Sequence, residues 1–202
     1  HDSIAAANAH MRKAIFSVWG HNNLTFSKIE WDKAKLYRKK NINPVLWDGL
    51  LSAYFGAYDA ADSIAAGLGK DEQTIITALV QMRQGCDIVK TYPADFYLKP
   101  RWNYYQIFLN YNLAICQIEI GRLDDALLSI KRLQEKYEIW GYHAVFYPKS
   151  FYLLGKLYEK RGDTAQAIKS YAKLIDLWKN GDQDLPELID AKARSARLQG
   201  LK

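Results

Sequence analysis

The chain contains two cysteines, Cys86 and Cys116. They would form a disulfide if folding brought them together, and would otherwise be free thiols. They lie far apart in the sequence, and each falls inside an apolar pattern with helical spacing. Two cysteines are too few for a disulfide framework, and alone they do not make a zinc site. Unpaired cysteines are common in protein cores. The sequence therefore favours two buried free thiols, with a single disulfide as the alternative.

Other residues capable of catalysis are present, but their spacing does not fit a known site. The segment Gly67–Lys70 lacks the spacing and the hydroxyl of a phosphate-binding loop. The carboxylate pairs Asp59/Asp62 and Asp124/Asp125 fall at turns or helix starts, where acidic residues are favoured because they cap the helix and offset its dipole. The four histidines have no metal-ligand spacing; they are His1, His10, His21 and His143. We therefore expect no enzyme, no cofactor and no metal.

The positive charge of the chain is modest, at a formal +6. Its densest cluster consists of Lys33, Lys35, Arg38, Lys39 and Lys40. Such a cluster can dock phosphates or an acidic partner, but it also suits the solvated end of a helix, where cations offset the helix dipole. We favour the second interpretation, so a nucleic-acid partner is not expected. No run of uncharged apolar residues is long enough for a membrane span. These features leave the compartment open.

The elements that would hold these residues are clearest in the segment from Phe151 to Trp178. Its apolar residues predict two amphipathic helices joined by a tight turn. Gly155 and Ala167 are small where the two helices would cross closely. Gly162 suits the left-handed residue that ends a helix, and Asp163 with Gln166 predicts a capping box that opens the next one.

This segment resembles the tetratricopeptide-repeat family in its order of an aromatic, Leu154-Gly155, Tyr158, Ala167 and Tyr171. A weaker copy precedes it, with Leu113-Ala114, Gly121, Ala126 and Ile130 at matching places, and a third, faint copy contains Gly49, Gly56 and Ala61. The C-terminal end is similar to the repeat regions of bacterial multidomain signalling proteins. This resemblance implies a bacterial protein and leaves its compartment open between cytoplasm and periplasm. The resemblance implies an all-α fold, a right-handed superhelix of antiparallel helix pairs with a C-terminal capping helix.

The rest of the sequence completes one expected domain over residues 1–202. Its repeats are placed at about 107–137 and 148–179, with the fainter one at about 42–68 and the capping helix at about 185–199. Pro186 and a capping box of Asp184 and Glu187 would open that last helix. Helices are also expected at 3–18, 26–40 and 71–91, and irregular segments at 92–100 and 137–148.

The resemblance implies a non-catalytic scaffold that binds a protein or peptide through its concave face. Counted from the family pattern, that face consists of Phe108, Tyr111, Asn112, Ile115, Lys149, Tyr152 and Lys156. Packing within the core is the alternative role for these aromatic residues. A second function hypothesis is a structural subunit that self-associates or organises a larger assembly. Its docking loop would carry the aromatic residues Trp140, Tyr142, Phe146 and Tyr147.

Overall fold

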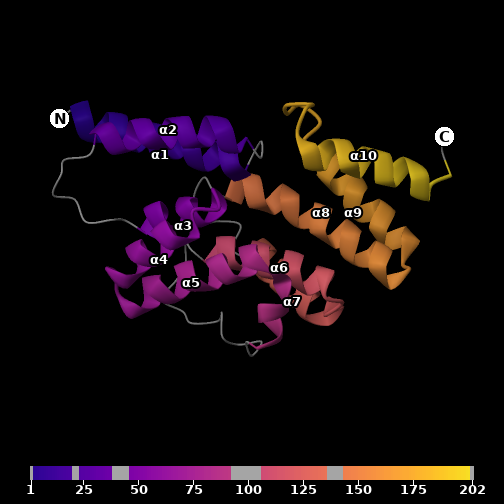
Figure 1. The fold of residues 1–202 in the computed structure, drawn as a ribbon. Coiled ribbons are helices and arrows are strands. Elements are labelled where there is room, and N and C mark those ends of the chain that lie inside the picture. The colour runs from indigo at the N-terminus through magenta and orange to yellow at the C-terminus, as the bar shows by residue number, and fades with distance from the viewer. Residues whose placement is uncertain (1, 20–22, 38–45, 92–105, 136–142, 201–202) are drawn as a thin grey trace. The chain divides into compact units, whose positions relative to one another are not determined.

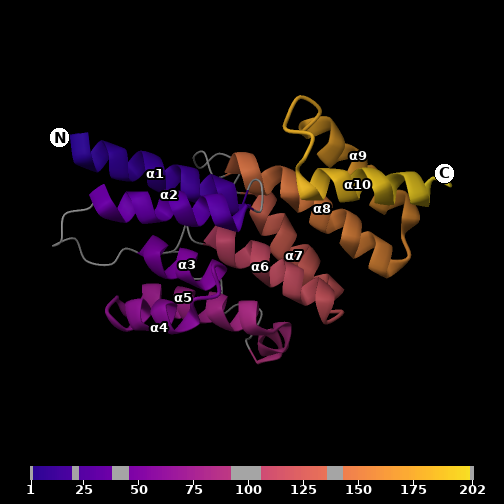
Figure 2. The same cartoon turned by 45° about the horizontal axis from the view of Figure 1, so that its top comes forward.

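The computed structural model describes residues 2–19, 23–37, 46–91, 106–135 and 143–200. Every regular element within those ranges is helical, as predicted, and the chain divides into two compact units, His1–Gln84 and Gly85–Lys202. Figures 1 and 2 show the helices of both units, coloured along the chain. None of the helices in the described ranges has the length and apolar character needed to cross a membrane.

The first unit contains five helices. They are α1 (Asp2–Trp19), α2 (Leu24–Tyr37), α3 (Leu46–Tyr54), α4 (Tyr58–Ala66) and α5 (Lys70–Gln84). The first two lie side by side in both views (Figures 1 and 2). Their contact buries Ile15 and Trp31, and the Ser27 hydroxyl donates to the carbonyl of Ala14 across it. The helices predicted for residues 3–18 and 26–40 therefore form and pack against each other, and the second is described to Tyr37.

A buried carboxylate also links α1 to α2. Glu30 accepts hydrogen bonds from Lys33 at 2.8 Å and from Nδ1 of His10 at 2.7 Å, and only 4% of its side chain is exposed. The bond from Lys33, then the one from His10, lower the pKa of Glu30 against the opposing effect of burial. Lys33 is thus engaged within its own unit, and Lys35 pairs with Asp32. The remaining members of the basic cluster, residues 38–40, lie outside the described residues.

The helix predicted over 71–91 is shorter than expected, because α5 ends at Gln84. Gly85 is extended, with φ 175° and ψ 143°, and residues Cys86–Lys90 form the 3-10 helix η1. Glycine costs about 1 kcal/mol in a helix relative to alanine. The apolar spacing runs on through Val89, but that side chain is buried in the second unit.

The second unit continues with α6 (Gln106–Glu119), α7 (Leu123–Glu135), α8 (His143–Arg161), α9 (Thr164–Leu177) and α10 (Pro186–Leu198). Each helix packs against the next, and α8 also packs against α6 and α10. This order is the one expected for stacked helix pairs, in which the first helices of successive pairs are neighbours. The helix pairs α6/α7 and α8/α9 occupy the two segments where clear repeats were placed.

The turns within these two pairs have the same geometry. Gly121 and Gly162 both have positive φ, at 82° and 75°, which glycine adopts without steric cost. The residue after each glycine donates its N–H back to the preceding helix, from Arg122 to Gln117 and from Asp163 to Tyr158. These two bonds satisfy carbonyls that the helix end leaves unpaired. The predicted helix-ending role of Gly162 is confirmed.

The N-terminus of α9 forms half of the predicted capping box. The Asp163 carboxylate accepts the backbone N–H of Gln166 at 3.1 Å. The backbone N–H of Asp163 is donated to Tyr158, so it is not available to the side chain of Gln166. The capping box predicted for α10 is wrong. Leu185 is the N-cap there, without a side-chain bond, and Glu187 is used elsewhere. Pro186 does lie in the first turn, as predicted.

The crossing of α8 and α9 is as close as the small residues predicted. A Cβ at Gly155 would overlap the ring of Tyr171, and Ala167 is fully buried beside that ring. Tyr171 itself is fully buried, with Leu174 and, from α10, Ala191. The last helix therefore covers the apolar face of the final pair.

The irregular segment predicted for 137–148 ends earlier than expected, because α8 begins at His143 and contains Pro148. Pro148 lies in the second turn of α8, where it supplies no N–H for an intrahelical hydrogen bond. Phe146 thus belongs to a helix and is 1% exposed.

Candidate functional site

The first three residues predicted for the concave face, Phe108, Tyr111 and Asn112, are buried in the structure. Their exposed fractions are 0%, 8% and 6%. The rings of Phe108 and Tyr111 both pack edge-on against Phe146, each with ring centroids 5.1 Å apart. The side chain of Asn112 donates to the carbonyl of Phe108 at 2.8 Å. In this structure these residues form the contact between α6 and α8 and leave little surface for a partner.

Lys149, the next predicted residue, is 3% exposed and holds three helices together. Its Nζ lies 2.5 Å from Oε1 of Glu187 on α10 and 5.9 Å from the ring centroid of Tyr111 on α6. Burial lowers the pKa of Lys149, while the negative charge and hydrogen bond of Glu187 oppose that effect. A buried cation held in this way is a structural group, because its charge is already matched.

Tyr152 begins a polar network that ties α8 to α10. Its hydroxyl donates to Oδ2 of Asp190 at 2.6 Å, and Arg194 donates to the same oxygen at 2.5 Å. Arg194 also reaches Glu159 at 3.3 Å, and Glu159 accepts the hydroxyl of Tyr171 at 2.6 Å. Burial, reinforced by Asp190, raises the pKa of Tyr152. The pKa of Tyr171 is raised in the same way, by burial and by Glu159.

Ile115 and Lys156 remain partly exposed, and they occupy equivalent places on α6 and α8. Lys156 lies over the ring of Tyr152, with Nζ 5.6 Å from the centroid. Its charge also helps to lower the pKa of Asp190, where hydrogen bonds from Tyr152 and Arg194 together outweigh the opposing effect of burial. Of the seven predicted residues, Ile115, Lys156 and part of Tyr152 are the ones that offer surface to a partner.

The aromatic residues predicted as a docking loop are divided by the structure. Trp140 and Tyr142 lie outside the described residues. Phe146 is buried, as described above, so its assignment to an exposed loop is wrong. Tyr147 is partly buried and packs edge-on against Phe151, with ring centroids 5.2 Å apart. Both described aromatic side chains therefore pack within the second unit.

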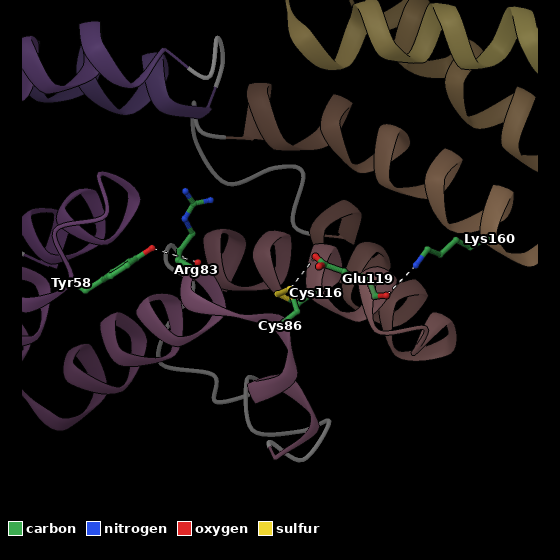
Figure 3. Close-up of a disulfide and its surroundings, with 6 residues drawn as sticks. All are labelled: Tyr58, Arg83, Cys86, Cys116, Glu119 and Lys160. Carbon is green, nitrogen blue, oxygen red and sulfur yellow. Dashed lines mark hydrogen bonds between the residues drawn. A yellow bond between two sulfur atoms is a disulfide. The ribbon is translucent and has the colours of Figure 1, made fainter.

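The two cysteines form a disulfide, which corrects the prediction of free thiols. Cys86 begins η1, Cys116 lies in α6, and their Cα atoms are 4.8 Å apart (Figure 3). Oε2 of Glu119 lies 3.3 Å from the sulfur of Cys86. Arg122 donates to the carbonyl of Val89 at 3.1 Å, which adds a second link between η1 and the chain after α6. Sequence spacing could not reveal this pairing, because tertiary packing sets the distance between the two residues.

The sequence also gave no sign of a pocket lined by α8 and α9. Its volume is about 480 Å³, and it lies between α8 and α9. Its lining residues are Phe151, Leu154, Tyr158, Gln166, Lys169, Ser170, Ala172, Lys173 and Asp176. The α8 residues and the α9 residues each form a stripe with helical spacing. Within the described ranges, no three His, Cys, Asp or Glu side chains gather closely enough to hold a metal ion.

Comparison with known proteins supports the repeat assignment for one segment. Residues 149–180 match the tetratricopeptide-repeat family. No curated protein and no solved structure is detectably similar to the chain. The matched segment runs from Lys149 through α9, and it contains the Gly155–Tyr171 crossing and the Gly162 turn. Residues 149–180 are therefore a tetratricopeptide repeat, and the described part of the chain is all-helical, with adjacent helix pairs that are consistent with a solenoid of that kind.

Proposed function

We propose that this protein is a non-catalytic scaffold that binds a protein or peptide partner. The observation that carries the proposal is the tetratricopeptide repeat at residues 149–180. Stacked helix pairs of this kind form extended surfaces whose first helices face a ligand. The first helices of the two pairs here are α6 and α8. The similarity of the C-terminal end to the repeat regions of bacterial multidomain signalling proteins is part of this proposal.

The surface proposed for the partner is narrower than the sequence predicted. It consists of Ile115, Lys156 and the exposed part of Tyr152, because the other predicted residues are buried. An apolar side chain next to an aromatic ring and a lysine suits a peptide with one apolar and one acidic side chain. The polar groups of Asp190 and Arg194 lie at the edge of this surface, where they are engaged by Tyr152 and by each other.

Affinity capture with two matched charge reversals tests the proposal. Lys156→Glu changes the proposed surface on α8, whereas Lys192→Glu makes the same change at an exposed lysine on α10. We expect an extract of the source organism to yield a protein retained by the native chain and by Lys192→Glu and lost with Lys156→Glu. Tyr111→Ala is a poor variant for this test, because Tyr111 is buried and its loss would disturb folding.

The other outcomes contradict the proposal. Equal capture by both variants would place the partner on another surface. Capture of further copies of this chain, with a solution mass that rises with concentration, would favour a structural subunit instead. Circular dichroism of each variant shows whether a lost partner reflects the surface or a loss of folding.

A further inference from the structure

The pocket between α8 and α9 is separate from the surface proposed above. Phe151, Leu154 and Tyr158 line it from α8. The residues of α8 that pair with α10, namely Lys149, Tyr152 and Glu159, lie on another side of the helix. At about 480 Å³ the pocket falls within the range of ligand sites, roughly 300–1,000 Å³.

The floor of this pocket is apolar, and its α9 rim is positively charged. Lys169 and Lys173 are exposed and lie one helical turn apart, so both side chains project on the same flank. Neither lysine has an ion-pair or hydrogen-bond partner among the described residues. The acid among the lining residues, Asp176, is paired instead with Lys179 at 3.2 Å.

Two lysines without ion-pair partners beside an apolar pocket can select a ligand by charge as well as by shape. Most other described lysines of the second unit are engaged: Lys149 with Glu187, Lys160 with backbone carbonyls, and Lys179 with Asp176. Complementary charges at the rim steer a partner and set its orientation, while the buried apolar contact supplies most of the affinity.

We infer that this pocket is a second docking site, which takes an acidic peptide segment of a partner protein. One large apolar side chain of the segment enters between Phe151, Leu154 and Tyr158. Carboxylates on the same segment, about one helical turn apart, meet Lys169 and Lys173. The pocket is only partly enclosed, which suits a segment of chain lying across it. The site adds to the proposed scaffold function and does not depend on Lys156.

Selection from a random peptide library displayed on phage tests this inference, with the whole chain as bait. We expect the enriched peptides to carry a large apolar residue flanked by Asp or Glu. One synthetic peptide from the selection is then labelled, and its affinity is measured by fluorescence anisotropy. Lys169→Glu/Lys173→Glu should weaken binding by about tenfold or more, since two rim pairs are reversed. Lys131→Glu/Lys192→Glu makes the same charge change at exposed residues outside the pocket and should leave affinity within about twofold.

Several results would overturn the inference. Enriched peptides without acidic residues, affinity unchanged by Lys169→Glu/Lys173→Glu, or no enrichment at all would each do so. Binding of decanoate to the native chain, with no acidic peptide enriched, would show a site for fatty acids instead. A peptide lost with Lys156→Glu but retained by Lys169→Glu/Lys173→Glu would support the α6/α8 surface alone, so the two proposals fail separately.

Discussion

Gly155 faces the ring of Tyr171 so closely that no side chain fits between α8 and α9 at that point. Replacing Gly155 with alanine should lower the free energy of unfolding by about 1–3 kcal/mol, because the added methyl group overpacks a filled core. Denaturant unfolding followed by circular dichroism measures the loss.

A second substitution provides the control for that prediction. Tyr171→Leu removes the ring, so Gly155→Ala should cost less in the Tyr171→Leu background than in the native chain. Equal costs in both backgrounds would mean that the glycine and the ring are not in contact.

The disulfide should stabilise the second unit against unfolding. Closing a loop across a sequence separation of 30 is worth about 2–4 kcal/mol in the chain-entropy model. Cys86→Ser/Cys116→Ser should lose that amount, and a reducing agent should have the same effect on the native chain only. Mass spectrometry of the unreduced digest should find residues 86 and 116 in one linked peptide; two titratable thiols in the folded native chain would contradict the bond.

Removing Glu187 alone should lower the stability of the fold more than replacing both Lys149 and Glu187. Glu187→Leu leaves a buried cation without its partner, at a cost of about 3–5 kcal/mol. Lys149→Met/Glu187→Leu removes both charges and should recover most of that loss, since apolar replacements of buried pairs are often neutral. Thermal unfolding of the two variants decides this. A double variant as unstable as Glu187→Leu would show that the pair is favourable in itself.

Alkaline titration should distinguish Tyr171 from exposed tyrosines. Its pKa is raised by burial and by Glu159, so the phenol stays protonated in the folded state above about pH 10, where free tyrosine ionises. Its contribution to stability is complete below about pH 10 and falls as pH rises further. The ultraviolet absorbance of tyrosinate should therefore rise in two stages, the second coinciding with unfolding. Tyr171→Phe should remove part of the second stage; an unchanged second stage would contradict the assignment.

Acidification should destabilise the first unit through Glu30. The folded pKa of Glu30 is lowered, so its contribution is present above the ordinary glutamate pKa of about 4.3 and is lost as pH falls through the folded value. The native chain should lose stability over that range more steeply than Glu30→Gln, measured by thermal unfolding at a series of pH values. Parallel curves would show that Glu30 does not couple to acid unfolding.

The sequence predicted those parts of the fold that depend on neighbours along the chain. Gly162 ends a helix and Gly155 permits a crossing for reasons that a short segment contains, and both predictions hold. The expected helix over 71–91 was too long, because its apolar spacing continues across Gly85 into a different packing environment. Tertiary contacts, which a local pattern does not encode, decide such cases.

The candidate site was predicted less well, for the same physical reason. Lys149 and Tyr152 were placed on a binding face by their offset in the repeat, but α10 supplies Glu187 and Asp190 as their partners. Those acids lie 38 residues further along the chain. The pairing of Cys86 with Cys116 and the pocket beside Lys169 likewise depend on helices that meet only after folding.

The bond between Cys86 and Cys116 also sets how the chain responds to mechanical force. A pull applied to the two ends passes directly from one cysteine to the other, so the chain between them bears no load. The hidden length is roughly 100 Å, from a separation of 30 residues at about 3.4 Å each. Reduction of the bond would release that length, and the extended chain would become longer by the same amount.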